Sequence, residues 1–181
     1  MSVENLITPL TDLETIPYLD VEGMLPQQFE GKIGVYAIFA EDQTMQYVGY
    51  SRDIYLSLKQ HLVRQPLLCH WIKVQTIDRP NRTLLEGIRH AWLQENGGSV
   101  PGNQTEQSRW EQAIDVKAAM TTKERAEYQD PQLDERSQLK ALKNAARRLE
   151  AEILDVLSQR GVQEPLRFNP KLKETGFLDL K

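Results

Sequence analysis

Side chains that could take part in catalysis or metal binding are concentrated in the middle of the chain. The segments Gly34-Val35-Tyr36 and Tyr47-Val48-Gly49 are separated by ten residues, so two phenol groups stand on neighbouring segments. An imidazole (His61) and a carboxylate (Glu86) follow, and Asn103 closes the stretch. Each also fits a structural role, because a tyrosine packs well with only its tip in water and a first-turn glutamate favours the helix dipole. Residue types alone therefore leave both interpretations open.

The elements that would position these residues have the patterns of a small α/β domain. Segments rich in β-branched and aromatic residues, or alternating in polarity, predict three strands at 33–39, 45–49 and 70–77. Apolar residues at helical spacing predict a helix that begins at a cap formed by Ser51 or Asp53 and runs to about Arg64, and a second helix over about 82–96 that is capped by Asn81. We therefore expect residues 31–104 to form a three-stranded sheet flanked by helices.

This combination of motif spacing and element order resembles the GIY-YIG nuclease superfamily over roughly residues 31–103. The family carries out metal-assisted phosphodiester hydrolysis. The resemblance implies that Tyr36 and Tyr47 lie near the attacking water, with His61 as a further catalytic residue. It also implies that Glu86 holds Mg²⁺ (or Mn²⁺) and that Asn103 is a binding residue. One carboxylate plus waters and a phosphate oxygen is a usual way of holding Mg²⁺.

The chain departs from the family pattern on its first helix, where Ser57 stands at the position of the phosphate-binding arginine. A serine hydroxyl does not replace a bidentate cation. Arg52 precedes the helix, and Arg64 lies about 10.5 Å further along its axis. The resemblance thus implies a nuclease fold with impaired hydrolysis that acts as a binding or assembly factor. The alternative is an active Mg²⁺-dependent endonuclease acting on DNA or RNA.

Composition narrows the classes of partner and compartment. The formal charge is −4, with −6 in residues 1–30, +2 in 31–103 and zero in 104–181. This balance argues against strong non-specific binding to nucleic acid. The single cysteine, Cys69, excludes internal disulfides, four-cysteine zinc sites and Cys-x-x-Cys redox pairs. No apolar run reaches the roughly 20 residues of a membrane span, and no secretory signal is evident, so we expect a cytoplasmic protein.

The flanking regions have different compositions. Residues 1–30 contain three prolines and no sustained period, which predicts an extended lead-in. Residues 105–161 predict an all-helical extension with helices at 106–119, after the Thr121–Glu124 capping box, and at about 133–160. The last helix carries a seam of apolar residues spaced by three and four, which are Leu139, Leu142, Ala146, Leu149, Ile153 and Val156. The seam packs on the chain's own helices, or it binds a partner protein or a second copy. Residues 162–181 are expected to form a surface tail.

Overall fold

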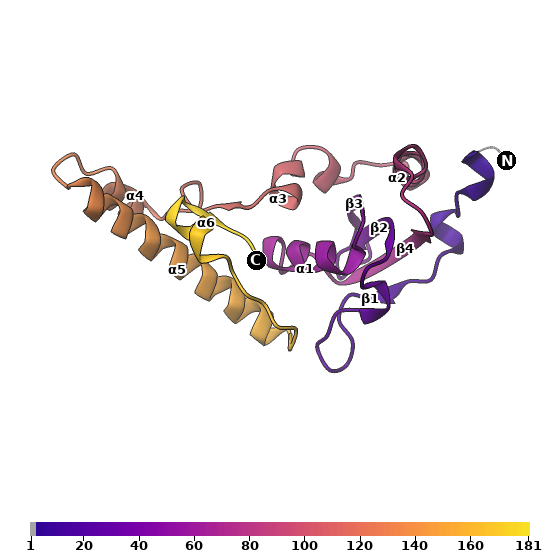
Figure 1. The fold of residues 1–181 in the computed structure, drawn as a ribbon, viewed down its shortest axis with the longest axis horizontal. Helices are drawn as coiled ribbons and strands as arrows, with labels where there is room; N and C mark the ends of the chain where they lie inside the picture. Colours follow the sequence, from indigo (N-terminus) through magenta and orange to yellow (C-terminus); the bar gives the residue numbers. More distant parts are fainter. Residues whose placement is uncertain (1–2) are drawn as a thin grey trace. The chain divides into compact units, whose positions relative to one another are not determined.

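The computed structural model describes residues 3–181, with side chains from residue 5 onward. The chain divides into two compact units. Unit 1 is Met1–Glu111 together with Val162–Glu164, and unit 2 is Gln112–Gly161 together with Pro165–Lys181. Both contain helices and strands, so the chain is a mixed α/β protein with a largely helical C-terminal part (Figure 1).

Unit 1 is built on a four-stranded antiparallel sheet. The prediction of a three-stranded sheet is therefore wrong, because it lacks one strand. The strand order is β1 (Ile16–Pro17), β4 (Trp71–Ile77), β2 (Ile33–Phe39) and β3 (Met45–Ser51). The additional strand β1 comes from the proline-rich lead-in and pairs with β4 through Ile16 and Ile72. Two residues are too few to show a period, so this strand exists only through its tertiary pairing.

Two helices cover the sheet of unit 1. Helix α1 (Ile54–Arg64) begins at Asp53, whose side chain accepts a hydrogen bond from the Leu56 backbone NH. Helix α2 (Arg82–Asn96) begins at Asn81 in the same way and ends at Gly97, which adopts a left-handed backbone conformation. Both helices and the Asn81 cap agree with the sequence prediction, and of the two candidate caps Ser51 and Asp53 the structure has Asp53.

Alternation along the strands sends side chains to two separate layers. Val35 and Ala37 of β2 lie in a core with α2, whereas Tyr36 and Ile38 project from the opposite face of the sheet. The core with α2 consists of Leu10, Val35, Ala37, Met45, Val48, Leu84, Leu85, Ile88, Trp92 and Val100. The predicted stripe of α1, which is Ile54, Leu58 and Leu62, is fully buried.

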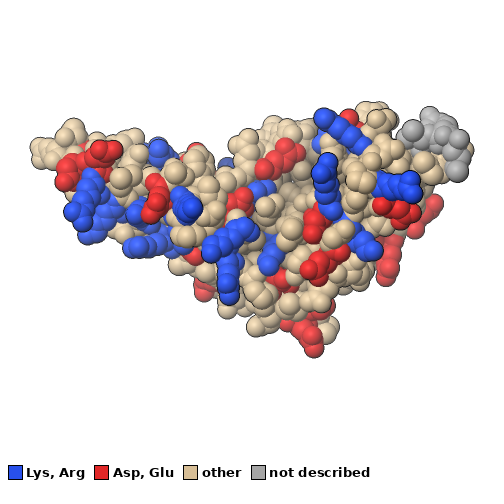
Figure 2. Space-filling model, viewed as in Figure 1, with Lys and Arg blue, Asp and Glu red and all other residues tan. Residues whose placement is uncertain are grey.

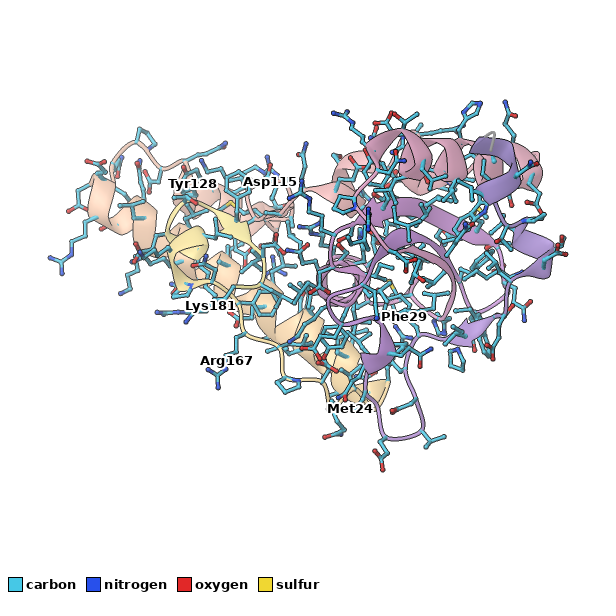
Figure 3. The ribbon with its side chains drawn as sticks, turned by 45° about the vertical axis from the view of Figure 1, so that its right-hand side comes forward. Met24, Phe29, Asp115, Tyr128, Arg167 and Lys181 are labelled. Carbon is cyan, nitrogen blue, oxygen red and sulfur yellow. The ribbon has the colours of Figure 1, made fainter. Side chains whose placement is uncertain are left out.

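The N-terminal segment of unit 1 is held to the sheet by polar side chains. It contains the short 3-10 helices η1 (Val3–Leu6), η2 (Leu10–Asp12) and η3 (Gln27–Phe29). Lys73 donates to the Leu10 carbonyl at 2.7 Å, and Gln75 donates to the Leu6 carbonyl at 2.7 Å. After η3, which ends at Phe29 (Figure 3), the chain turns into β2. The polar positions of β4 therefore serve to bind the lead-in.

Unit 2 consists of β5 (Ile114–Asp115), α4 (Thr122–Tyr128), α5 (Glu135–Gln159), α6 (Pro170–Glu174) and β6 (Phe177–Leu178). The helix predicted over 106–119 is wrong in length, because α3 covers only Gln107–Glu111. Ile114 and Asp115 instead pair with β6 from the end of the chain. In Figure 3, Asp115 and Tyr128 mark β5 and the end of α4.

The C-terminal residues are packed into unit 2, unlike the surface tail expected over 162–181. Phe168 and Leu178 are buried, and Phe168 forms an isolated bridge with Leu180. Helix α5 packs on α4, α6 and β6. Leu142, Ala146 and Ile153 of the predicted seam are buried, Leu149 and Val156 are half-buried, and Leu139 is exposed.

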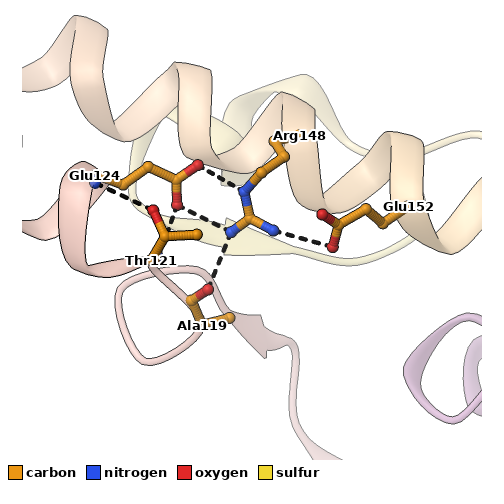
Figure 4. A network of polar contacts seen from close by, with 5 residues as sticks. All are labelled: Ala119, Thr121, Glu124, Arg148 and Glu152. Atoms are coloured by element: carbon orange, nitrogen blue, oxygen red, sulfur yellow. Dashed lines mark hydrogen bonds and ion pairs between the residues drawn. The ribbon is translucent and has the colours of Figure 1, made fainter.

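An arginine of α5 ties α4 to α5 in unit 2 (Figure 4). Arg148 donates to both carboxylate oxygens of Glu124, at 2.6 and 2.9 Å, and to Glu152 at 2.9 Å. It also donates to the Ala119 carbonyl at 3.0 Å. Glu124 completes the predicted capping box with Thr121. The Arg148 guanidinium lowers the pKa of Glu124, so both groups are charged at neutral pH.

Candidate functional site

Three of the predicted site residues meet in one aromatic cluster on the α1 face of the sheet in unit 1. The Tyr36 hydroxyl lies 2.8 Å from His61 Nε2. The ring centres of Tyr47 and His61 are 4.8 Å apart, and Tyr47 stacks on Trp110 at 5.3 Å with an interplanar angle of 4°. We call Tyr36, Tyr47, His61 and Trp110 the aromatic cluster. It combines two phenols, an imidazole and an indole.

Burial keeps the titratable members of the aromatic cluster neutral. Desolvation, helped by the positive charge of Arg64, lowers the pKa of His61 to about 3. Desolvation also raises the pKa of Tyr36 and of Tyr47 far above the usual value for a phenol, and the Ser57 hydroxyl offsets a little of this for Tyr36. At neutral pH the imidazole carries no charge. The Tyr36–His61 contact is thus a hydrogen bond between neutral groups.

The spacing of the two tyrosine motifs has a packing explanation in this cluster. A Cβ atom at Gly49 would lie 2.6 Å from Tyr47 Cε1 and 2.9 Å from the Tyr36 hydroxyl. Gly49 lies opposite Tyr36 in the β2–β3 ladder. A side chain at this position would therefore displace both rings. The motif residues therefore fit close packing on this face of the β2–β3 hairpin.

Residues of α3 form the outer rim of the cluster. The Tyr47 hydroxyl donates to Glu111 at 3.1 Å, and Gln107 donates to the other oxygen of Glu111 at 3.0 Å. Arg64 Nη1 donates to the Trp110 carbonyl at 2.8 Å. Trp110 and Glu111 were not identified as site residues from the sequence. No sequence motif marks either residue.

Glu86, the predicted metal ligand, belongs to a different group of side chains. It accepts from Arg82 at 2.8 Å and from the Tyr50 hydroxyl at 3.1 Å, and the Arg89 guanidinium lies 5.9 Å from the Tyr50 ring centre. The hydrogen bond from Arg82 lowers the pKa of Glu86. Tyr50 packs against the core with α2, on the face opposite the aromatic cluster. Over the part of the chain that the structure describes, no group of three or more His, Cys, Asp or Glu side chains could hold a metal ion.

The four remaining predicted binding residues lie in different settings. Arg52 is exposed in the turn before α1. Ser57 lies on α1 beside Tyr36, and Arg64 is at the end of the same helix. Asn103, in the 3-10 helix η4 (Pro101–Asn103), bonds the backbone of edge strand β3. Its amide accepts from the Val48 NH at 2.8 Å and donates to the Val48 carbonyl at 2.7 Å.

Comparison with known proteins finds no matching family model. One curated relative is the protein named bifunctional monothiol glutaredoxin-S16, chloroplastic, of Arabidopsis thaliana. The two sequences are 28% identical over 107 residues, which cover 57% of this chain and 35% of the relative. The chain thus spans about a third of the length of the relative that it matches.

These comparisons overturn the predicted membership of the GIY-YIG superfamily. No family model supports it, and the relative carries the name of a glutaredoxin. The impaired nuclease-fold factor, its alternative of an active endonuclease, and the nuclease and hydrolase chemistry rested on that resemblance and are corrected with it. The expectation of Mg²⁺ or Mn²⁺ came from the same resemblance and stays a prediction. The physical reason is that close packing of Tyr36 and Tyr47 over Gly49 also accounts for this spacing of glycine and tyrosine residues.

The described helices give no sign of a membrane span. None of them is both long enough and sufficiently apolar to cross a bilayer.

Proposed function

We propose that the chain is a binding protein that holds an acidic segment of a partner protein on the outer face of α5. The observation that carries the proposal is a row of four cations, Arg136, Lys140, Lys143 and Arg147, spaced by four, three and four residues. At 100° per residue these positions fall within about 60° of one another and extend over about 16 Å of the helix. We call them the cationic row.

The cationic row lies opposite the buried face of α5. Ala141, Leu142, Ala145 and Ala146 face the interior of unit 2, while Arg136, Lys140 and Arg147 are exposed. Among the described residues, no carboxylate lies within ion-pair distance of these three exposed cations. Figure 2 shows Lys and Arg side chains gathered along the lower edge of the part that contains α4, α5 and α6. The row is therefore available to an external anion.

The surroundings of the row favour an acidic peptide over a phosphate backbone. The side chain of Leu139, which is 43% exposed, lies beside the row, and Leu154, which is 39% exposed, continues it. A protein segment with carboxylates and apolar residues would satisfy both kinds of side chain. Helix α5 contains no aromatic side chain on which a base could stack.

Thiol chemistry of the kind in the relative's name is not favoured by the position of Cys69. Its side chain is fully buried, and Sγ lies 3.6 Å from the His61 carbonyl. Reactive thiols are partly exposed in electropositive surroundings. Peptide binding gives the exposed cations of α5 a function, whereas a thiol function at Cys69 would give them none.

The test measures binding of a fluorescein-labelled poly-glutamate peptide by anisotropy at low salt. We expect binding that weakens with added salt and that is lost when Arg136, Lys140 and Arg147 are all changed to Gln. The matched control changes three exposed cations elsewhere, Arg79, Arg109 and Lys123, to Gln, and should retain binding. Equal losses in both triple variants would contradict the proposal. So would binding of duplex DNA in place of the peptide.

A further inference from the structure

We propose that Glu174 of α6 is an internal competitor for the cationic row, so that α6 limits access of the acidic partner; this inference rests on the proposed function. Lys143 lies between Lys140 and Arg147 in the row and is the member with a carboxylate partner. Its Nζ atom lies 3.3 Å from Glu174 Oε1. Glu174 thus occupies the position that a partner's carboxylate would take.

Unit 2 holds α6 where Glu174 can reach Lys143. Asn169 caps α6 by accepting from the Lys171 backbone NH at 3.0 Å, and Pro170 is its first residue. Lys173 forms an ion pair with Glu150 of α5. After α6, Gly176 adopts a φ of +87° against Leu142, and the chain continues into β6. These contacts fix α6 independently of the Lys143–Glu174 pair.

The Lys143–Glu174 pair is exposed enough to exchange. The exposed fractions of the two side chains are 41% and 63%, whereas those of the neighbouring Lys173–Glu150 pair are 23% and 21%. An exposed ion pair contributes little net free energy, because both groups are hydrated when it opens. An incoming carboxylate can therefore replace Glu174 without disturbing the attachment of α6 through Lys173.

The experiment is a double-mutant cycle on Lys143 and Glu174, read out as binding of the poly-glutamate peptide. We expect Glu174→Gln to tighten binding by about two- to five-fold, the range of an exposed ion pair. In a Lys143→Gln background the same change should have a clearly smaller effect. Glu127→Gln, on an exposed carboxylate of α4, makes the same change of net charge and serves as the control.

Each result decides the inference. If Glu174→Gln tightens binding equally with and without Lys143, or no more than Glu127→Gln does, the competitor role is wrong while the proposed function stands. If neither the wild type nor Glu174→Gln binds the peptide, the proposed function fails and the inference with it. Should Glu174→Gln lower the melting temperature, Glu174→Asp replaces it, because the shorter side chain withdraws the carboxylate from Lys143 and should also tighten binding.

Discussion

At the scale of single residues, three polar side chains of unit 1 each have one specific hydrogen-bond partner residue. The Tyr36 hydroxyl bonds His61, the Tyr47 hydroxyl bonds Glu111, and Asn103 bonds both backbone groups of Val48. A buried polar group that loses its partner is costly, since water cannot replace that partner. These residues should therefore control stability and its pH dependence.

Acid should destabilise the protein through His61. The folded-state pKa is about 3, below the ordinary value of 6.5 expected after unfolding, so the unfolded chain binds the proton first. Stability is fully present above about pH 6.5 and falls as the pH decreases toward 3, with a loss of about 2 kcal/mol at pH 5. Urea unfolding at several pH values measures this. His61→Gln should flatten the profile between pH 6.5 and 5, whereas exposed His90→Gln should not. An unchanged slope in His61→Gln would contradict the assignment.

Asn103 should protect the free edge of the sheet. Strand β3 is the last in the order, and the Asn103 amide bonds Val48 as a neighbouring strand would. Asn103→Ala should lower the free energy of unfolding by about 1–3 kcal/mol and promote association through the exposed edge. Urea titration and light scattering measure the two effects. Asn103→Asp keeps only the acceptor and should also destabilise. An unaltered unfolding midpoint in Asn103→Ala would refute the role.

At the scale of elements, α5 presents two different faces along one helix. Its apolar face packs against α4, α6 and β6, and its cationic row faces outward. The predicted seam described the first face correctly over Leu142, Ala146 and Ile153. The alternative that the seam packs on the chain's own elements is thus confirmed for these residues. The surface proposed for a partner lies on the opposite side.

Two leucines three residues apart test which side of α5 is buried. Leu142 is 2% exposed and Leu139 is 43% exposed. Leu142→Asp should cost about 3 kcal/mol or more, because it places a carboxylate in an apolar contact without a partner. Leu139→Asp should change the stability by only about 0.5 kcal/mol. Thermal unfolding followed by circular dichroism compares them. Similar losses in both variants would show that the burial pattern is wrong.

At the scale of the whole molecule, the two units differ in net charge, and the single cysteine belongs to one of them. Unit 1 carries a formal charge of −6 and unit 2 a charge of +2, so the overall value of −4 conceals a cationic unit. The cysteine lies in unit 1, two residues before β4 and away from solvent. Overall composition thus described neither the cationic row nor the environment of the thiol.

The Cys69 thiol should be inert in the folded protein. Burial prevents a reagent in solution from reaching Sγ, so modification requires opening of unit 1. Ellman's reagent should react slowly with the native protein and rapidly in guanidinium chloride. Cys69→Ala should retain peptide binding. Prompt reaction of the native thiol would contradict burial and would favour a thiol function instead.

The sequence by itself determined the local elements of this protein. Asp53 and Asn81 cap the helices that their spacing predicted, the hairpin of β2 and β3 follows its β-branched and aromatic residues, and Thr121 forms its capping box. Such signals act between residues a few positions apart. The sequence also identified Tyr36, Tyr47 and His61, which the structure brings together, although the family inferred from their spacing was wrong.

Tertiary structure decided everything that depends on distant partners. Strand β1 forms only against β4, and β5 forms only against β6, more than sixty residues later. Trp110 joins the aromatic cluster, Glu86 pairs with Tyr50 away from it, and Glu174 reaches Lys143. None of these pairings leaves a local pattern, because a contact across the fold depends on how elements pack and not on the period within either one.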